Sequence, residues 1–346
     1  MAPMSTAPTA TLSREWRLAR RPTGAPSESD VELVETVLGR PGAGEVLVRN
    51  TAMSVEPYMW GRMAGTADYV EPFAIGAPMS GRAVGVIEHS EDPSLPPGTT
   101  VLHEAGWREA ALLPVTEVRA VPAGSVPPHA WLGALGIPGF TAYVGLLDIA
   151  RCRPGDTVFV SAAAGAVGSA VVQVARAMGC TVIGSAGSAA KVRFLLDELG
   201  LDAAFDYHDG PLRDALAGAL ERAGQDGLDV YFDNVGGEHL EAAIRRMRDH
   251  GRIALCGAIS TYAGGVPGPR NLLVAIWRRL RIEGFIATDH TERRPSFERV
   301  MAGWLADGRI RNVETVRTGG IAAAFSAFAG LLEGRDIGKT VVALGE

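Results

Sequence analysis

The chain has 346 residues and a formal net charge of −6, with 47% hydrophobic and 21% charged residues. This is the composition of an ordinary globular protein, and the length favours two domains over one. The acidic balance argues against nucleic acid or an anionic membrane as the main partner, and no apolar run is long enough to span a bilayer. We therefore expect no nucleic-acid partner and no membrane partner.

The N-terminal residues 1–12 are rich in alanine, threonine and proline, and we expect them to form a disordered tail. They lack the basic and apolar stretches of a signal peptide. The three cysteines, Cys152, Cys180 and Cys256, lie far apart in the sequence and form no Cys-x-x-Cys pair. This pattern predicts a cytoplasmic protein without a disulfide framework, in which each cysteine is a small buried hydrophobe.

Short β-strands separated by turns are predicted for the first third of the chain. Apolar or alternating runs at 44–50, 81–89, 95–102 and 108–122 lie between glycines and prolines. No helical period stands out before residue 128. The pattern predicts a β-rich, barrel-like domain.

Strands and helices alternate from residue 136 onward. Strand candidates at 157–162, 181–187, 203–208, 228–236, 252–259 and 281–289 alternate with helix-period segments that include 169–179, 190–200, 210–224, 238–251 and 295–308. This alternation predicts an α/β domain with a doubly wound parallel sheet that binds its ligand at the carboxyl ends of the strands. A strand, a helix at 321–333 and a final strand follow, and we expect them to return to the first domain. We predict two domains. Residues 13–135 and 310–346 together form the β-rich domain, and residues 136–309 form the α/β domain.

The segment 157–168, TVFVSAAAGAVG, predicts a phosphate-binding turn between a strand and a helix. Gly165 would let the backbone approach a pyrophosphate, and Gly168 would let the helix pack closely on the sheet. The helix N-terminus supplies free N–H groups for the anion. The first glycine of the usual motif is Ala163 here, and such a turn can also be plain packing.

The end of the next strand indicates which dinucleotide would bind. An acidic residue about twenty positions past the glycines would accept hydrogen bonds from the ribose hydroxyls of NAD. This chain instead has Gly187, Ser188 and Lys191, with no carboxylate among residues 185–191. A lysine and a serine hydroxyl suit a 2′-phosphate, although Lys191 could also be an ordinary solvated residue. The segment favours NADP(H) over NAD(H).

Several motifs together resemble one family: SVEPYMWGRM at 54–63, AAAGAVGS at 162–169, Lys191, YFDNVGG at 231–237 and CGAISTY at 256–262. The chain resembles the zinc-independent medium-chain dehydrogenase/reductases. Within them it is most similar to the prostaglandin reductase and leukotriene B4 12-hydroxydehydrogenase branch, which includes alkenal and curcumin double-bond reductases. The resemblance spans nearly the whole chain. It implies a GroES-like domain, a Rossmann domain, NADPH in the cleft between them, and a homodimer formed through the cofactor domains.

The resemblance also implies roles for individual residues. Lys191 and Tyr207 would meet the 2′-phosphate, and Asn234 would reach the cofactor from the fourth strand. Asp336 stands where the family usually has asparagine, so it keeps an acceptor but adds a charge. The pyrophosphate would be held by Gly165, Ala166, Val167 and Gly168, and the nicotinamide side would be lined by Cys256, Gly257, Ala258, Ile259, Ser260, Tyr262, Phe285, Ile286 and Ala287.

One departure from the family pattern affects the expected substrate. In SVEPYMWGRM, Val55, Glu56 and Trp60 replace leucine, aspartate and arginine. Trp60 turns a basic position beside the cleft into a large apolar one. We expect the pocket formed by Tyr58, Trp60 and Tyr262 to favour bulkier or less anionic enones.

The residue types at hand suit hydride transfer without a metal. The seven histidines are scattered without ligand spacing, and no cysteine quartet is present. Hydrogen-bond donors must then polarise a carbonyl while hydride adds to the β-carbon of an α,β-unsaturated ketone or aldehyde. Tyr262 and Tyr58 are the candidate catalytic donors, and aromatic packing is the alternative for each. Quinone reduction, NADP-dependent oxidation of an allylic alcohol, and a non-catalytic NADPH-binding protein stay open as alternative functions.

Overall fold

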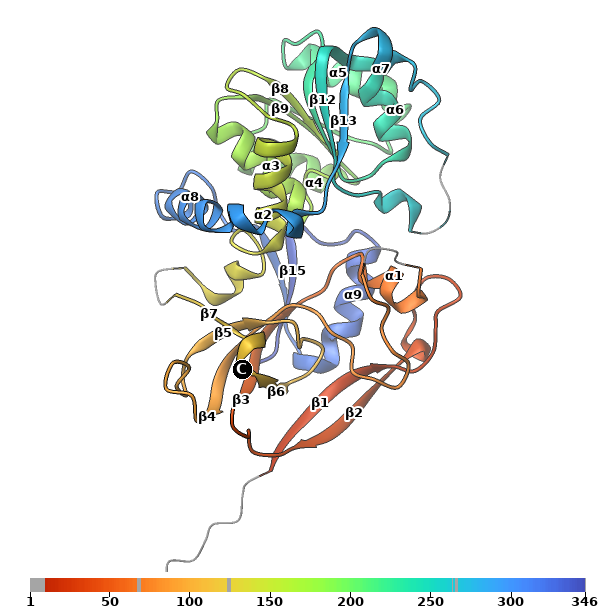
Figure 1. The fold of residues 1–346 in the computed structure, drawn as a ribbon. Helices are drawn as coiled ribbons and strands as arrows, with labels where there is room; N and C mark the ends of the chain where they lie inside the picture. The colour runs from red at the N-terminus through yellow and green to blue at the C-terminus, as the bar shows by residue number, and fades with distance from the viewer. Residues whose placement is uncertain (1–9, 67–69, 123–125, 263, 265–266, 346) are drawn as a thin grey trace, which may run out of the picture. The chain divides into compact units, whose positions relative to one another are not determined.

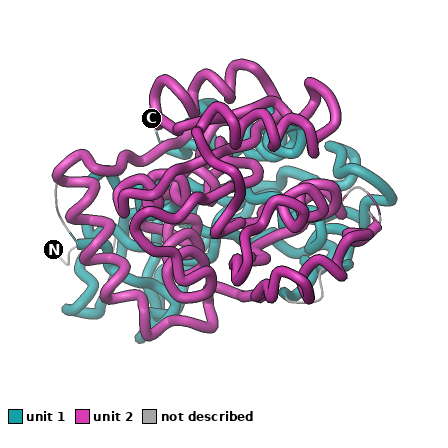
Figure 2. The backbone as a smooth tube through the Cα atoms, turned by 90° about the horizontal axis from the view of Figure 1, so that it is seen from above, with its two compact units in different colours: residues 1–132, 316–335, 340–346 teal, residues 133–315, 336–339 magenta. Residues whose placement is uncertain are grey.

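The computed structural model describes residues 10–66, 70–122, 126–262, 264 and 267–345. The chain divides into two units, shown in different colours in Figure 2. Unit 1 holds the described residues up to Leu132, Val316–Arg335, and the residues from Thr340 onward, whereas unit 2 holds Gly133–Thr315 and Asp336–Lys339. In the part of the chain that the structure describes, no helix is long and apolar enough to cross a membrane.

An antiparallel sheet forms most of unit 1 (Figure 1). Its strand order is β14-β15-β3-β4-β5-β7, and β6 also pairs with β3. The strands predicted in the first third of the chain are confirmed as β3, β4, β5, β6 and β7. The bounds are β3 (Glu45–Ser54), β4 (Ala83–Ser90), β5 (Thr100–His103), β6 (Ala110–Pro114), β7 (Arg119–Ala120), β14 (Glu314–Arg317) and β15 (Lys339–Ala343).

Most of the C-terminal segment belongs to unit 1, but residues 133–135, 310–315 and 336–339, which the predicted division places in the first domain, belong to unit 2. Strand β15 pairs antiparallel with β3, so that Val341 lies opposite Ser54. The predicted helix at 321–333 is a 3₁₀ turn at Gly320–Ala323 followed by α9 (Ala324–Leu332). Phe328 of α9 packs edge-on against the fully buried Trp107, with ring centroids 6.0 Å apart. The last helix therefore covers the core of the β-rich unit.

Two features near the N-terminus differ from the predictions. The expected tail at 1–12 is wrong at Thr11 and Leu12, which begin β1 (Thr11–Leu18) and pair with β2 (Val31–Leu38). Residues 1–9 lie outside the described residues. The six-residue helix α1 (Met59–Ala64) was not predicted, because one turn and a half is too short to establish a helical period.

Unit 2 contains the predicted doubly wound sheet. Its six strands are all parallel and follow the order β10-β9-β8-β11-β12-β13, which is the order of a dinucleotide-binding fold. All four residues of β8 are buried, as expected for a sheet covered on both faces. The bounds are β8 (Thr157–Val160), β9 (Thr181–Ala186), β10 (Ala203–Asp206), β11 (Leu228–Asp233), β12 (Met247–Leu255) and β13 (Arg281–Gly284).

Helices cover the two faces of this sheet. Tyr231 packs in a buried cluster with residues of α5 and α6, whereas the next residue, Phe232, lies against Gly145 on the opposite face. Successive side chains of a strand point to opposite faces, so both faces are covered. The helices are α2 (Ile137–Val144), α3 (Ala166–Ala177), α4 (Ala189–Arg193), α5 (Leu212–Arg222), α6 (Gly237–Arg246), α7 (Val274–Trp277) and α8 (Arg294–Ala306), with π-helical turns at Gly145–Ile149 and Phe194–Glu198.

The helix predicted at 238–251 is too long. Helix α6 ends at Arg246, and β12 begins at Met247, which lies opposite Leu228 of β11. Met247 is buried and β12 pairs with β11, and these contacts favour a strand although the helical periodicity of the sequence continues. Arg248, the second residue of β12, pairs with Asp226 and Asp229.

Candidate functional site

The glycine turn joins β8 to α3, as the sequence predicts. Gly165 is the N-cap residue of α3, and its N–H donates to the Ala162 carbonyl at 3.0 Å. A Cβ atom added to Gly168 would lie 2.3 Å from that same carbonyl oxygen, which is backbone and cannot turn away. Glycine at 168 therefore lets the first turn of α3 sit directly on the strand, with its N–H groups at the sheet edge.

A distant segment, residues 336–339, pairs with this turn. The Gly338 N–H donates to the Ala164 carbonyl at 2.8 Å, and Gly338 and Gly165 form an isolated parallel bridge. Gly338 has a φ of +70°, and a Cβ there would lie 2.2 Å from the Val313 carbonyl oxygen. The chain can make this approach only with glycine, and it brings the buried Asp336 into unit 2. The predicted division, which places these four residues in the first domain, is wrong here.

The residues expected to select the cofactor lie just after the end of β9. Ser188 caps α4, and its Oγ accepts a hydrogen bond from the Lys191 backbone N–H at 3.3 Å. Partial burial lowers the pKa of the Lys191 ammonium, while the Asp336 carboxylate opposes this shift. Lys191 therefore lies close enough to the buried Asp336 carboxylate to interact with it electrostatically. Asp336 is the residue that replaces the asparagine of the family pattern.

Tyr207 follows β10 and stands against the same strand end. Its N–H donates to the Ala186 carbonyl at 3.1 Å, and a Cβ added to Gly187 would lie 2.9 Å from its hydroxyl oxygen. Its ring also meets His239 edge-on at a centroid distance of 5.2 Å. The structure thus gathers Gly187, Ser188 and Tyr207 at the carboxyl end of β9, the edge at which α4 begins.

Asp233, the last residue of β11, organises the loop that follows this strand and is not among the predicted site residues. Its Oδ1 accepts hydrogen bonds from the Tyr231 hydroxyl at 2.7 Å and from the N–H groups of Val235 and Gly236 at 3.0 and 2.8 Å. Burial raises the pKa of Asp233, although these hydrogen bonds oppose the shift. The signal that could have found it is an acidic residue directly after an apolar strand.

Asn234 is held by the neighbouring strand. Its Nδ2 donates to the Ser161 carbonyl at 2.8 Å, and its backbone N–H donates to Ser161 Oγ at 3.0 Å. These contacts fix the amide beside the end of β8, where the glycine turn begins. Its predicted contact with the cofactor stays a prediction.

The segment 256–262 folds back onto the loop after β11. The N–H groups of Cys256 and Gly257 donate to the Asp233 carbonyl at 2.9 and 3.0 Å, and Ser260 Oγ donates to the Val235 carbonyl at 2.5 Å. Burial raises the pKa of the Cys256 thiol to about 12, so this thiol is not a nucleophile at neutral pH. Ala258 and Ile259 lie between these anchored residues.

Tyr262 closes a 3₁₀ turn at Ile259–Thr261 and is half-buried. Phe285, Ile286 and Ala287 follow β13, the sheet edge strand beside β12. Phe285 packs edge-on against Phe232, with centroids 6.2 Å apart, so it has a packing role of its own. Ile286 is 44% exposed, whereas Ala287 is buried.

The predicted site residues of unit 2 share one location. They follow the carboxyl ends of β8, β9, β10, β11, β12 and β13, apart from Asp336, which the segment 336–339 carries to the glycine turn. Carboxyl ends of parallel strands lie at one edge of the sheet, where doubly wound folds bind nucleotides. The geometry is that of a dinucleotide site.

Tyr58 and Trp60 belong to unit 1. Burial raises the pKa of the Tyr58 hydroxyl well above its ordinary value, and Glu56 adds to the shift, so this phenol stays protonated. Trp60 is half-buried against the core of unit 1, and its indole N–H donates to the Gly24 carbonyl at 3.1 Å. Their place in a substrate pocket stays a prediction.

His239, in the first turn of α6, is also not among the predicted site residues. It is 5% exposed, and its Nε2 has no hydrogen-bond partner among the described residues. Burial lowers its pKa to about 4, so the imidazole is neutral at physiological pH. Its edge-on contact with Tyr207 supports the ring at the end of β10.

Comparisons with known proteins agree with this geometry. Residues 14–121 match a family model described as the N-terminal domain of oxidoreductase, and residues 166–304 match one described as zinc-binding dehydrogenase. The 2-alkenal reductase (NADP(+)-dependent) of Nicotiana tabacum is 40% identical over 92% of this chain and 94% of its own. Prostaglandin reductase 1 of Rattus norvegicus is 40% identical over 95% of this chain and 98% of its own. The chain belongs to the zinc-independent medium-chain dehydrogenase/reductases.

A solved relative shares both units of this reductase fold. The crystal structure of CurA from Vibrio vulnificus in complex with NADPH is 38% identical, has a TM-score of 0.89, and aligns with 96% of this chain and 99% of that protein. Unit 1 is the GroES-like domain of this architecture and unit 2 is its Rossmann domain. Within the described ranges, no group of three or more His, Cys, Asp or Glu side chains is placed to hold a metal ion.

The Rossmann domain of this reductase fits NADP(H) on three structural grounds. The Ala162 carbonyl leaves no room for a side chain at Gly168, so the first turn of α3 lies close to the strand. The N-terminus of α3 provides N–H groups for a pyrophosphate. Lys191 stands where NAD-binding folds place an acidic residue. These features together suit a dinucleotide with an extra phosphate. NADP(H) is the cofactor of this enzyme.

Proposed function

We propose that this protein is an NADPH-dependent oxidoreductase that reduces the carbon–carbon double bond of α,β-unsaturated ketones or aldehydes. The observation that carries the proposal is the end of β9, where Ser188 and Lys191 replace an acidic residue beside a glycine turn shaped for a pyrophosphate. The names of the relatives support the substrate class, since 2-alkenal reductase, (+)-pulegone reductase and NADPH-dependent curcumin reductase are among them.

Residues of unit 2 would hold the cofactor. The N–H groups at the start of α3 would bind the pyrophosphate, and Lys191 with Ser188 and Tyr207 would bind the 2′-phosphate. Asn234 and the segment 256–262 would border the nicotinamide, with Phe285 and its neighbours beside them. The hydrogen bonds that the Asp233 carboxylate and the Ser161 carbonyl accept hold these loops before any ligand arrives, which reduces the entropy lost on binding.

NADPH supplies a hydride when it is bound, and the protein must polarise the acceptor. We propose that the Tyr262 hydroxyl donates a hydrogen bond to the substrate carbonyl, whose oxygen gains negative charge as the β-carbon receives hydride. Tyr58 is the second candidate donor, because it too offers a phenolic O–H at a position that the family resemblance places near the nicotinamide. A fixed donor in a site without bulk water stabilises such charge more than water does.

A substrate panel tests the reaction class. Purified enzyme would be supplied with NADPH and a cyclic enone, an alkenal or a quinone, and with NADP⁺ and an allylic alcohol. We expect the highest kcat/KM with the enone or alkenal and recovery of the saturated carbonyl compound. A preference for the quinone or the alcohol would identify one of the alternative functions, and tight NADPH binding without turnover would indicate a non-catalytic protein.

We also propose a homodimer formed through unit 2. Strand β13 ends the sheet, and near it lie four large exposed apolar side chains: Leu272, Leu273, Ile276 and Trp277 are 54%, 64%, 68% and 67% exposed. Exposed apolar clusters of this kind typify protein interfaces. Light scattering should give twice the chain mass, and Trp277→Glu should give the monomer. The control Val37→Glu, at a residue of unit 1 that is 65% exposed, should stay dimeric.

A cytoplasmic location completes the proposal. Its support is the cysteine pattern of the sequence, because an odd number of cysteines with no Cys-x-x-Cys pair is typical of a reducing compartment. Fractionation of cells with an antibody against the protein would test the location, and enrichment in an extracellular fraction would contradict it.

A further inference from the structure

Two cysteines that are 28 positions apart in the sequence meet inside unit 2. The Sγ atoms of Cys152 and Cys180 lie 3.4 Å apart, and each residue is 8% exposed. Cys152 precedes β8 and Cys180 immediately precedes β9, two neighbouring parallel strands. The sequence predicted isolated buried cysteines, because nothing in their spacing shows that the two strand starts are adjacent.

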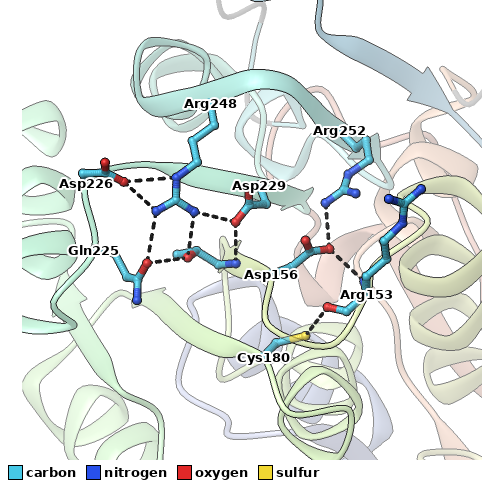
Figure 3. A network of polar contacts seen from close by, with 9 residues as sticks. Arg153, Asp156, Cys180, Gln225, Asp226, Asp229, Arg248 and Arg252 are labelled. Atoms are coloured by element: carbon cyan, nitrogen blue, oxygen red, sulfur yellow. Dashed lines mark hydrogen bonds and ion pairs between the residues drawn. The ribbon is translucent and has the colours of Figure 1, made fainter.

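The backbone around the two thiols is firmly held. Cys180 Sγ donates to the Arg153 carbonyl at 3.3 Å, as Figure 3 shows. The turn that carries Arg153 is closed by Asp156, whose Oδ2 accepts hydrogen bonds from the Arg153 N–H and from the Arg252 guanidinium, both at 2.7 Å. The Thr181 N–H donates to the Asp156 carbonyl at 3.0 Å and joins the two segments. The sulfur atoms are therefore kept in contact by the chain.

The two thiols differ in their readiness to ionise. The contact between the two sulfur atoms lowers the pKa of Cys180 and raises the pKa of Cys152. The thiolate is the nucleophile in cysteine chemistry. Either sulfur can attack as the thiolate, and the other is then the resolving partner already at contact distance.

We propose that Cys152 and Cys180 form a reversible disulfide when the enzyme meets a hydroperoxide. The sulfur atoms need to approach by about 1.4 Å to reach the length of a disulfide bond, a movement that small side-chain rotations can supply. Cys256 lies in the segment that folds onto the β11 loop, and it has no thiol partner within the described residues.

The reaction balances with one hydroperoxide. The thiolate of one cysteine attacks the peroxide oxygen, the O–O bond breaks, and a sulfenic acid forms as hydroxide leaves and takes up the proton that the thiol released. The sulfur of the other cysteine then attacks the sulfenic sulfur, forms the S–S bond and releases water. Two thiols and one hydrogen peroxide give one disulfide and two waters, so each sulfur loses one electron. A thiol reductant reverses the reaction by thiol–disulfide exchange.

The bond would tie together the starts of β8 and β9 at the sheet edge opposite the glycine turn. It would close a loop that contains β8 and α3, and this restricts the unfolded chain. For a loop of this length we expect oxidation to raise Tm by about 5 °C or more.

The test is mass spectrometry on the full-length protein. Hydrogen peroxide is added, remaining thiols are alkylated, and the protein is digested with trypsin. Cleavage after Arg151, Arg176 and Lys191 puts Cys152 and Cys180 in separate peptides, 152–176 and 177–191, because the bond between Arg153 and Pro154 resists trypsin. We expect these two peptides to be joined after oxidation, the Tm to rise, and dithiothreitol to reverse both changes.

Matched variants identify the bond. Cys256→Ser should still give the joined peptides and the Tm rise, whereas Cys152→Ala and Cys180→Ala should each lose both. Peptides joined through Cys256, or sulfinic acid on Cys180 with Cys152 left alkylated, would overturn the proposal. An oxidised protein with no joined peptide would overturn it equally. None of these readouts depends on enzymatic activity, so they stand apart from the proposed reductase function.

Discussion

Replacing Lys191 tests how the enzyme selects its cofactor. We expect Lys191→Ala to remove a charge-assisted hydrogen bond to the 2′-phosphate, an interaction typically worth about 1.5–3 kcal/mol. Lys191 is only half-buried and the Asp336 carboxylate already acts on it, so the lower part of that range applies. A loss of about 2 kcal/mol corresponds to about 30-fold in kcat/KM for NADPH. NADH lacks the phosphate, so its kcat/KM should change by less than about twofold.

The assay measures kcat/KM for NADPH and NADH with one enone. Arg193→Ala is the matched control, because Arg193 is an exposed cation on the same helix. Asp336→Asn should tighten NADPH binding, and Lys191→Ala made in that background should show a larger loss, since the opposing carboxylate is gone. An equal fall for both cofactors, or a fall for NADPH of less than about threefold, would refute the argument.

The pH dependence provides an independent check on Lys191. Burial lowers the pKa of this ammonium, and the charged form exists below that pKa. The KM for NADPH should therefore rise as the pH increases through the pKa of Lys191, at a lower pH than for an exposed lysine. The KM for NADH should stay level across the same interval, and in Lys191→Ala the rise should vanish.

Further substitutions test the remaining parts of the site. Tyr262→Phe should lower kcat by about tenfold or more with little change in the KM for NADPH, and a wild-type kcat would remove Tyr262 from catalysis. Gly168→Ala should weaken NADPH binding and destabilise the protein to urea by about 1–3 kcal/mol, because its Cβ would lie 2.3 Å from the Ala162 carbonyl oxygen. Gly303→Ala, with open space at its Cβ, should leave both unchanged or slightly improved. Trp60→Arg should shift kcat/KM toward carboxylate-bearing enones, and an unchanged ratio to neutral enones would contradict the expected role.

The sequence predicted the parallel sheet of unit 2 well, because its apolar strands and glycine-ended helices are local patterns. The prediction from sequence failed where a local periodicity continues beyond the end of the element, because contacts with distant residues decide where the element ends. The helical period of 238–251 runs on beyond Arg246, but Met247 is buried opposite Leu228 and begins a strand. Likewise, the paired β1 and β2 supply backbone hydrogen bonds that no local period reveals.

Some residues of the candidate site could likewise be predicted from the sequence, and others could not. Gly165, Gly168 and Lys191 could be read from spacing along the chain, because each lies within one strand–turn–helix unit. Asp233 could not be predicted in this way, because its role depends on hydrogen bonds from Tyr231, Val235 and Gly236 and from Ser161 at the end of the neighbouring strand. Contacts between distant segments were also hidden, including the meeting of Gly338 with the glycine turn and of Cys152 with Cys180.

The most direct test of the proposed reaction follows one isotope. The enzyme would turn over NADPH in which both hydrogens at C4 of the nicotinamide are deuterium, with an α,β-unsaturated ketone as acceptor, and the product would be examined by NMR. We predict one deuterium on the β-carbon of a saturated ketone, with one NADP⁺ formed for each product molecule. Deuterium on the carbinol carbon of an allylic alcohol, or an acceptor left unchanged, would contradict the account.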